Sequence, residues 1–383
     1  MSSPLTSADA QVIVIGGGVV GAASAHALTR RGVSTLVLEA EREPALGASG
    51  TNSGIVHTGF DSPPGELETE LILRAGQLRE NLFDELGVPL RRCGALLAPL
   101  DAGERETVSA MAEAARRNGV ETQLGEDGSL SVPGESVTDP VAYTRALLAA
   151  AKAGGADLRT ATRVEAVVRA SGGLELGLAG GGSVRCAVAV NCAGLHADAV
   201  ARMAGDDSFE VYPRKGEFFV FEPPGGQPLE RILLPVPTKR TKGVLVFPTI
   251  DGKLVAGPTA HDQDDKRDWS LRESARAEVM EKAARLLPEL EAAEPIASYA
   301  GLRPAGRGVN YLIGRAGGCP ELINVAAIRS TGLTASPGIG ERVAGLVAEQ
   351  GIELGPARPL PAPPQADGEP WWLRAARRAE LAA

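Results

Sequence analysis

The sequence is poor in cysteine, histidine and aromatic residues, and it has no excess of positive charge. Its four cysteines, Cys93, Cys186, Cys192 and Cys319, are scattered without a CxxC pair, which argues against a metal or iron–sulfur site and a disulfide framework. The net charge of −9 argues against nucleic acid as a general partner. No apolar run reaches the length of a transmembrane segment, and the first ten residues do not resemble a signal peptide. We therefore expect a cytoplasmic protein.

Residues 11–39 carry the clearest local pattern. An apolar strand at 11–15 leads into G-x-G-x-x-G at Gly16, Gly18 and Gly21, followed by an Ala-rich helix at 19–31 and a second strand at 33–38 that ends in Glu39. The three glycines permit a tight turn, close approach to a pyrophosphate and close helix packing. Glu39 can accept hydrogen bonds from a ribose, and it disfavours NADP. A glycine-rich turn without a ligand is the alternative, but all five features sit in register.

The rest of the chain alternates between helical and strand patterns. Helices are expected at 66–86, 104–118, 140–153 (with Asp139 as its cap) and 274–287. Strands are expected at 88–99, 158–168, 183–192, 210–221, 232–237, 243–249 and 254–257. A last unit has a strand at 322–327, a Gly-rich loop and a helix at 340–350.

With 383 residues, the chain is suited to two domains. We expect an α/β fold, α+β overall, in which a Rossmann-like nucleotide-binding domain is interrupted by an antiparallel-sheet substrate domain. The first domain takes residues 10–60, 141–205 and 319–354, and the second takes 61–140 and 206–318. Residues 355–383 form a Pro-rich linker and a tail that could be a short helix.

Seven ordered segments carry a family resemblance. They are GGGVVGAASAHAL (16–28) with Glu39, SGTNSGIVHTGF (49–60), NCAGLHAD (191–198), YPRKGEFFVF (212–221), the segment 233–260, AGLRP (300–304) and IRSTGLTASPGIGE (328–341). With them the sequence resembles the FAD-dependent D-amino-acid oxidase superfamily, and within it the glycerol-3-phosphate dehydrogenase and L-2-hydroxyglutarate oxidase branch. The resemblance implies FAD as the cofactor.

The resemblance also implies which residues contact FAD. A loop after the second strand offers polar groups to the pyrophosphate and the flavin edge, and a backbone position at 164 meets the adenine. The last glycine loop presents backbone donors to the flavin ring. The implied cofactor residues are Gly16, Gly18, Gly21, Glu39, Ser49, Asn52, Ser53, Gly54, Val164, Ala193, Gly194, Gly332, Leu333, Thr334 and Ala335.

Two residues are the implied catalytic groups. His57 would lie beside the flavin and accept the substrate's hydroxyl proton, since imidazoles titrate near neutral pH. It could instead attach the flavin covalently or be structural, as we expect for His26. Arg303 would hold the anionic end of the substrate; a surface ion pair is its alternative. Arg329 and Lys239 are further candidates for substrate binding. Lys215, Arg240 and Lys242 add positive charge in the same region.

The expected activity is oxidation of a secondary alcohol in a small anionic substrate, with hydride transfer to flavin N5. Glycerol 3-phosphate is the leading substrate, and an L-2-hydroxy acid is next. Amine or amino-acid oxidation, or a flavin-binding assembly subunit, are the alternatives on the same fold.

The tail raises the question of the electron acceptor. Larger relatives can carry a C-terminal [2Fe–2S] domain that this sequence lacks, so electrons would pass to another subunit or to quinone. Trp371 and Trp372, followed by several arginines, could dock such a partner or rest on a membrane surface. The alternative is that this pair folds back onto the chain's own surface.

Overall fold

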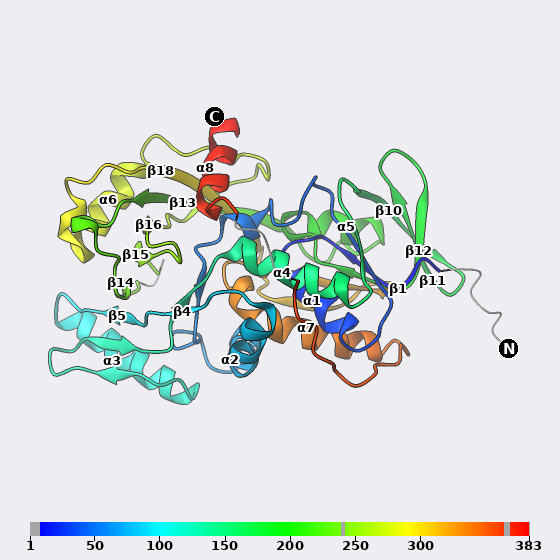
Figure 1. Ribbon diagram of the computed structural model, residues 1–383, viewed down its shortest axis with the longest axis horizontal. Helices are drawn as coiled ribbons and strands as arrows, with labels where there is room; N and C mark the ends of the chain where they lie inside the picture. The colour runs from blue at the N-terminus through cyan, green and yellow to red at the C-terminus, as the bar shows by residue number, and fades with distance from the viewer. Residues whose placement is uncertain (1–7, 239–241, 364–367, 383) are drawn as a thin grey trace.

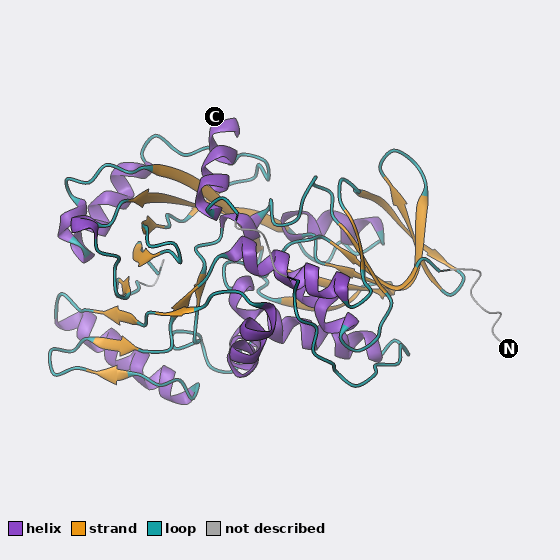
Figure 2. Ribbon diagram, viewed as in Figure 1, coloured by secondary structure: helices purple, strands orange, loops and turns teal. Residues whose placement is uncertain are grey.

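The computed structural model describes residues 8–238, 242–363 and 368–382. These residues form two large β-sheets that lie beside one another along the long axis of the molecule (Figure 1), each covered by helices (Figure 2). The first sheet is parallel at its centre and the second is mostly antiparallel. This arrangement confirms the predicted fold class.

The first sheet has eight strands, of which the central ones follow the expected nucleotide-binding order. The parallel strands are β9 (Asp157–Arg159), β2 (Thr35–Leu38), β1 (Ala10–Ile15), β12 (Ser183–Asn191) and β20 (Cys319–Ala326). The antiparallel strands β10 (Val164–Ala170), β11 (Gly173–Leu178) and β19 (Leu312–Ala316) extend it.

Both faces of this sheet are buried, which explains why its strands read as continuous apolar runs. Val12 and Val14 of β1 face a helical layer, and Ile13 and Ile15 face the strands β10 to β12. The helical layer consists of α1 (Val19–Thr29), α2 (Leu67–Leu86), α4 (Pro140–Ala153) and α7 (Gly332–Ala348). On the other side lie η2 (Gly194–His196) and α5 (Ala197–Met203).

The helix α4 occupies the range that the sequence predicted. Its cap, Asp139, accepts hydrogen bonds from the amides of Val141 and Ala142 at 2.8 and 2.9 Å, which satisfies two of the donors that a helix start leaves unpaired. Pro140 at the first helical position needs no partner for an amide. The adjacent residues Asp139 and Pro140 therefore specify this helix start, so it can be predicted from the local sequence.

Strand β13 (Val211–Phe221) pairs along its whole length with β18 (Ala297–Gly306), and together they form the spine of the second sheet. The other strands are β5 (Ala95–Leu97), β6 (Gln123–Leu124), β7 (Leu130–Val132), β14 (Ile232–Leu234), β15 (Leu245–Pro248), β16 (Leu254–Gly257) and β17 (His261–Asp262). Helix α6 (Ala275–Leu286) packs on β13, β15 and β16, and α3 (Ala102–Arg117) shares a core with β5 and β7.

Several short elements lie outside the two large sheets. A three-stranded sheet is made of β3 (Ile55–Val56), β8 (Ser136–Val137) and β4 (Arg91–Arg92). Single 3₁₀ turns occur at η1 (Ala48–Thr51), η3 (Pro224–Gly226) and η4 (Pro288–Leu290).

Two parts of the expected domain division differ from the structure. Helix α2 and strand β19 were expected in the substrate domain, but both pack with the first sheet. The leucine stripe of α2 enters the core that α1, α4 and α7 share, and Phe83 stacks on Tyr143 of α4 with 4.6 Å between ring centroids. Strand β19 pairs with β20. The leucine spacing correctly predicted helix α2, but it could not show that this helix packs against α1, α4 and α7.

The tail forms the helix α8 (Trp371–Ala382), which packs on β18 and η1. Trp371 and Trp372 are buried, with 1 and 5 % of their surfaces exposed. The Trp371 ring meets Tyr299 edge-on at 5.5 Å, and the Trp372 indole donates a hydrogen bond to Asp251 at 3.0 Å. The tryptophan pair is therefore part of the chain's own core, and the hypothesis that it forms an exposed docking anchor is wrong.

The segment before α8 is also fixed to the first sheet's helices. The amides of Gly355 and Arg358 donate to the carbonyl groups of Arg31 and Arg30, both at 2.9 Å. Within the described residues, we find no helix with the length and apolar character needed to cross a bilayer.

His26 leads to a prediction about stability. It is 3 % exposed on α1, and burial, followed by the nearby Arg30, lowers its pKa from 6.5 to about 4. The unfolded chain thus binds a proton more readily, so the stability contributed by neutral His26 is complete above pH 6.5 and is lost as the pH falls through the folded-state pKa. We expect this group to lower the free energy of unfolding by about 2 kcal/mol between about pH 7 and pH 5.

Urea unfolding of the wild type and the variant His26→Gln at both pH values measures this contribution. The variant should lose about 2 kcal/mol less than the wild type on acidification. Equal losses in the two proteins would show that His26 does not contribute to the acid sensitivity.

Candidate active site

A cleft of about 760 Å³ opens where the parallel strands of the first sheet end. Its walls come from the segments that follow β1, β2, β12 and β20, the place where open α/β sheets bind ligands. Among the predicted residues, the cleft is lined by Gly16, Gly18, Glu39, Ser49, Asn52, Val164, Ala193, Gly194, Arg329, Gly332 and Leu333. The others that the structure describes do not line it: Gly21, Ser53, Gly54, His57, Arg303, Thr334 and Ala335.

The glycines after β1 are required by close backbone contacts. Gly16 has φ +110°, and a Cβ there would lie 2.4 Å from the carbonyl oxygen of Cys192. A Cβ on Gly21 would lie 1.9 Å from the oxygen of Gly16, so the helix could not approach the turn. Beside Gly18 the nearest atom to a Cβ is the Ser49 hydroxyl, at 3.1 Å. The backbone at the start of α1 is thus left open toward the cleft.

Glu39 closes the adjacent side of the cleft. Its carboxylate accepts hydrogen bonds from the amides of Gly17 at 2.6 Å and Glu41 at 2.8 Å. Burial raises the pKa of Glu39, and these amide donors oppose that shift. A carboxylate held by two backbone donors beside a glycine turn fits the ribose of a dinucleotide, and the open helix start fits its diphosphate.

The loop after β2 connects the two ends of the cleft. The Ser49 hydroxyl accepts a hydrogen bond from the Val19 amide at 2.9 Å, at the start of α1. The Asn52 amide group donates to the Ser330 carbonyl at 3.2 Å. Ser53 and Gly54 turn the chain away from the cleft: Gly54 has φ +78°, and a Cβ there would lie 2.3 Å from the Thr138 oxygen. Their cofactor contacts remain a prediction.

Residues 332–335 were expected in a loop, but they form the first turn of α7. Pro337 lies in the second turn of this helix and has no amide hydrogen for the Leu333 carbonyl. The Ser336 hydroxyl donates a hydrogen bond to that carbonyl instead, at 3.0 Å. The amides at this helix start have no partner one turn earlier within the helix. Their position still fits an electron-rich edge of a flavin ring.

His57 lies next to this helix start. Its amide donates to the Thr334 hydroxyl at 3.1 Å, and its Nδ1 lies 2.9 Å from a carboxylate oxygen of Glu135. Glu135 is fully buried and also accepts from the amide and hydroxyl of Thr58, at 2.6 and 2.8 Å. With Nδ1 donating to this carboxylate, the neutral imidazole presents Nε2 as an acceptor. No hydrogen bond from the described residues occupies Nε2.

An ion pair lies close to His57. Asp61 pairs with Lys242, whose side chain is exposed. Burial alone would raise the pKa of Asp61, but Lys242 and His57 outweigh burial and leave that pKa lowered. Lys239, the lysine predicted to bind substrate, lies outside the described residues. Lys242 is described, and its ion pair with Asp61 places it close to His57.

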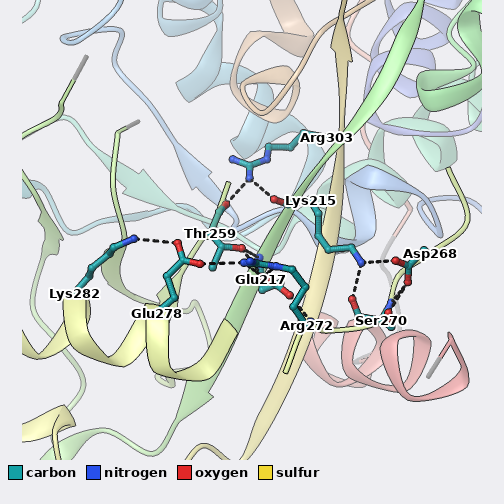
Figure 3. A network of polar contacts seen from close by, with 9 residues as sticks. All are labelled: Lys215, Glu217, Thr259, Asp268, Ser270, Arg272, Glu278, Lys282 and Arg303. Atoms are coloured by element: carbon teal, nitrogen blue, oxygen red, sulfur yellow. Dashed lines mark hydrogen bonds and ion pairs between the residues drawn. The ribbon is translucent and has the colours of Figure 1, made fainter. Parts of the chain in front are cut away.

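Arg303 of β18 lies against the paired strand β13, and Lys215 and Thr259 connect it to a network of polar contacts (Figure 3). Its guanidinium donates to the backbone oxygens of Arg214, Lys215 and Thr259, at 3.1, 3.1 and 2.7 Å. Burial, followed by the neighbouring Arg214 and Arg329, lowers the pKa of Arg303 to about 10. No carboxylate among the described residues forms an ion pair with Arg303, so the predicted alternative of a surface ion pair is not seen there.

The network in Figure 3 fixes the carbonyl groups that hold Arg303. The Thr259 hydroxyl donates to the buried Glu217 at 2.7 Å, and Glu217 receives the guanidinium of Arg272 at 2.6 Å. Arg329 stands at the cleft with φ +57°, and none of the described acidic side chains pairs with it. Arg303 and Arg329 together make this end of the cleft attractive to an anion.

Glu135, Arg79 and Asp61 are the site residues that sequence reasoning missed. Glu135 sits in a short turn, and Arg79 reaches the His57 carbonyl from α2. None belongs to a recognisable motif, because each acts across a contact between distant segments. The residues around Glu135, LSVPGESV at 130–137, indicate only a turn at Pro133 and Gly134.

Known proteins are similar to this chain over most of its length. The model of the DAO family, described as FAD dependent oxidoreductase, matches residues 11–346. A glycerol 3-phosphate dehydrogenase from Caloramator mitchellensis is 29% identical over 344 residues, covering 86% of this chain and 72% of the relative. A glycerol 3-phosphate oxidase from Mycoplasma pneumoniae is 28% identical over 356 residues, covering 86% and 92%.

Solved structures are similar to this chain over nearly its whole length. The dithionite-reduced L-alpha-glycerophosphate oxidase from Mycoplasma pneumoniae with FAD bound matches with a TM-score of 0.84 and 26% identity, over 92% of this chain and 97% of that one. The glycine oxidase from Geobacillus kaustophilus matches with a TM-score of 0.78 and 25% identity, over 94% and 99%.

Proposed function

This chain belongs to the DAO family of FAD-dependent oxidoreductases, and we propose that it oxidises the secondary hydroxyl group of glycerol 3-phosphate. The observation that carries the proposal is the His57–Glu135 pair beside the cleft, with Nε2 of His57 unoccupied and two arginines nearby. The relatives named for glycerol 3-phosphate, which this chain matches over 86% of its length, support the choice of substrate.

FAD, when bound, accepts a hydride from the substrate carbon that carries the hydroxyl group. His57 takes the hydroxyl proton at Nε2, so that the products are a ketone and a protonated imidazole. Glu135 holds the imidazole in the tautomer that can accept this proton and stabilises the imidazolium that forms. Arg303 and Arg329 bind the phosphate group, which places the reacting carbon at a fixed distance from the base.

A second candidate substrate is an L-2-hydroxy acid. A mouse mitochondrial L-2-hydroxyglutarate dehydrogenase is 29% identical over 282 residues, covering 64% of this chain. The same arginines would bind a carboxylate, because carboxylate and phosphate both accept a bidentate guanidinium. The electron acceptor, whether oxygen, quinone or a protein subunit, stays a separate prediction, and the buried Trp371–Trp372 pair is no longer an argument for a subunit.

Anaerobic titration of the purified yellow protein with glycerol 3-phosphate, L-2-hydroxyglutarate and glycine tests the proposal. We expect glycerol 3-phosphate to bleach the flavin absorbance at the lowest concentration. Bleaching by 2-hydroxyglutarate or glycine alone would favour the hydroxy acid or amino-acid alternative. A protein that keeps its colour with every substrate would contradict an enzymatic role and favour the flavin-binding assembly subunit.

A further inference from the structure

The C-terminal helix reaches the cofactor cleft from outside the region that the family model matches. That match ends at residue 346, whereas α8 begins at Trp371. The side chain of Arg378 on α8 nevertheless lines the same cleft as Gly16, Gly18 and Glu39. In Figure 1 this helix, in red, stands over the junction of the two sheets, close to β13 and β18.

Arg378 is held in place by an aromatic platform. Its guanidinium carbon lies 3.9 Å from the centroid of the Trp269 ring, a cation–π distance. Trp269 is 5 % exposed and packs with Leu195 and Leu302. The loop that carries Trp269 is anchored on both sides: Lys215 bonds to Asp268 and to the Ser270 carbonyl, each at 2.8 Å (Figure 3).

The helix itself is tied to the loop that follows Glu39. Arg374, one turn before Arg378, forms an ion pair with Glu43 at 2.8 Å. Helix α8 also contacts η1, and Ser49 of η1 bonds to the amide at the start of α1. Arg378 therefore lines the cleft together with Glu39 and the start of α1, and Glu41 is its acidic neighbour.

The charge of Arg378 has no ion-pair partner among the described residues. Burial lowers its pKa, and the nearby Glu41 carboxylate acts against that shift. Arg377, its neighbour on the exposed side of α8, is paired with Glu369. A guanidinium stays protonated at neutral pH even when partly buried, so the cleft wall carries a fixed positive charge at this point, with Glu41 nearby but not in an ion pair with it.

We propose that Arg378 binds the diphosphate of FAD and that α8 is therefore a part of the cofactor site which retains FAD. The diphosphate is the anionic part of oxidised FAD, and a planar guanidinium binds phosphate oxygens through two parallel hydrogen bonds. The inference uses the family's cofactor but does not depend on which substrate the enzyme oxidises.

FAD release from the holoenzyme tests the proposal, with flavin fluorescence after dilution as the readout. In Arg378→Met the side chain keeps its packing on Trp269 and loses its charge, and we expect FAD to dissociate about 10²-fold faster than from the wild type, the effect of two charge-assisted hydrogen bonds at about 1.5 kcal/mol each. Arg378→Lys should fall in between. Arg377→Met is the matched control and should release FAD at the wild-type rate.

Two results would overturn the proposal. One is a release rate in Arg378→Met equal to that of Arg377→Met. The other is wild-type retention in Arg378→Tyr together with fast release in Arg378→Lys, which would mean that position 378 stacks on the adenine. If Arg378→Met does not fold, Arg378→Gln takes its place: raising the ionic strength should speed FAD release from the wild type more than from this uncharged variant, and identical salt dependence in the two proteins would contradict the diphosphate contact.

Discussion

Replacing His57 by alanine should leave FAD bound and slow flavin reduction by glycerol 3-phosphate about 10²–10⁴-fold, the usual effect of losing a general base. The imidazole Nδ1 lies 2.9 Å from a carboxylate oxygen of Glu135, and no described residue forms a hydrogen bond with Nε2. Since His57 does not line the cofactor cleft, FAD content should remain normal. Anaerobic rapid mixing with excess substrate measures the rate.

The decrease in the rate of flavin reduction in His57→Ala should depend on pH. Raising the pH should recover part of the rate in His57→Ala, because hydroxide and ionised substrate then substitute for the missing base. His261→Ala is the control, since His261 is exposed at the sheet edge on β17, and it should behave as wild type. A His57→Ala protein that reduces its flavin at the wild-type rate would show that the base is elsewhere.

Replacing Arg303 by lysine should lower kcat/KM for glycerol 3-phosphate about 10²-fold, mainly through KM. Three backbone carbonyl groups align the guanidinium through Nε and Nη2, which leaves the two N–H donors of Nη1 for a phosphate. A lysine ammonium has three donors in all and cannot keep that alignment and also bind a phosphate. Two charge-assisted hydrogen bonds at about 1.5 kcal/mol each correspond to a factor of about 10². Steady-state kinetics gives both constants.

Arg307→Lys provides the comparison, because Arg307 follows β18 directly and is exposed, with Glu210 as its partner at 2.9 Å. This variant should keep the wild-type KM. An unchanged KM in Arg303→Lys would remove Arg303 from substrate binding and leave Arg329 and Lys242 as the cations to test.

Features set by neighbouring residues could be predicted from the sequence. The turn at Gly16 to Gly21, the carboxylate of Glu39 and the capped start of α4 each depend on a few adjacent positions and their backbone geometry. The same is true of the leucine spacing in α2. Such signals give an element and its local role.

Features that join distant segments could not be predicted in the same way. Glu135 meets His57 across 78 residues, and Arg378 meets the Trp269 ring through α8, a helix that lies outside the family match. The tryptophan pair was visible in the sequence, but whether a partner or the chain itself covers it depends on β18 and η1. Only the packed structure supplies those contacts.

The central claim, that this chain oxidises the C2 hydroxyl group of glycerol 3-phosphate at its FAD, is tested most directly by single-turnover reduction with substrate deuterated at C2. The account predicts complete loss of flavin absorbance, one ketone formed per FAD, and a slower reduction with deuterium at C2 than with deuterium at C1. A flavin that keeps its absorbance, or one that is reduced without ketone formation, would contradict it.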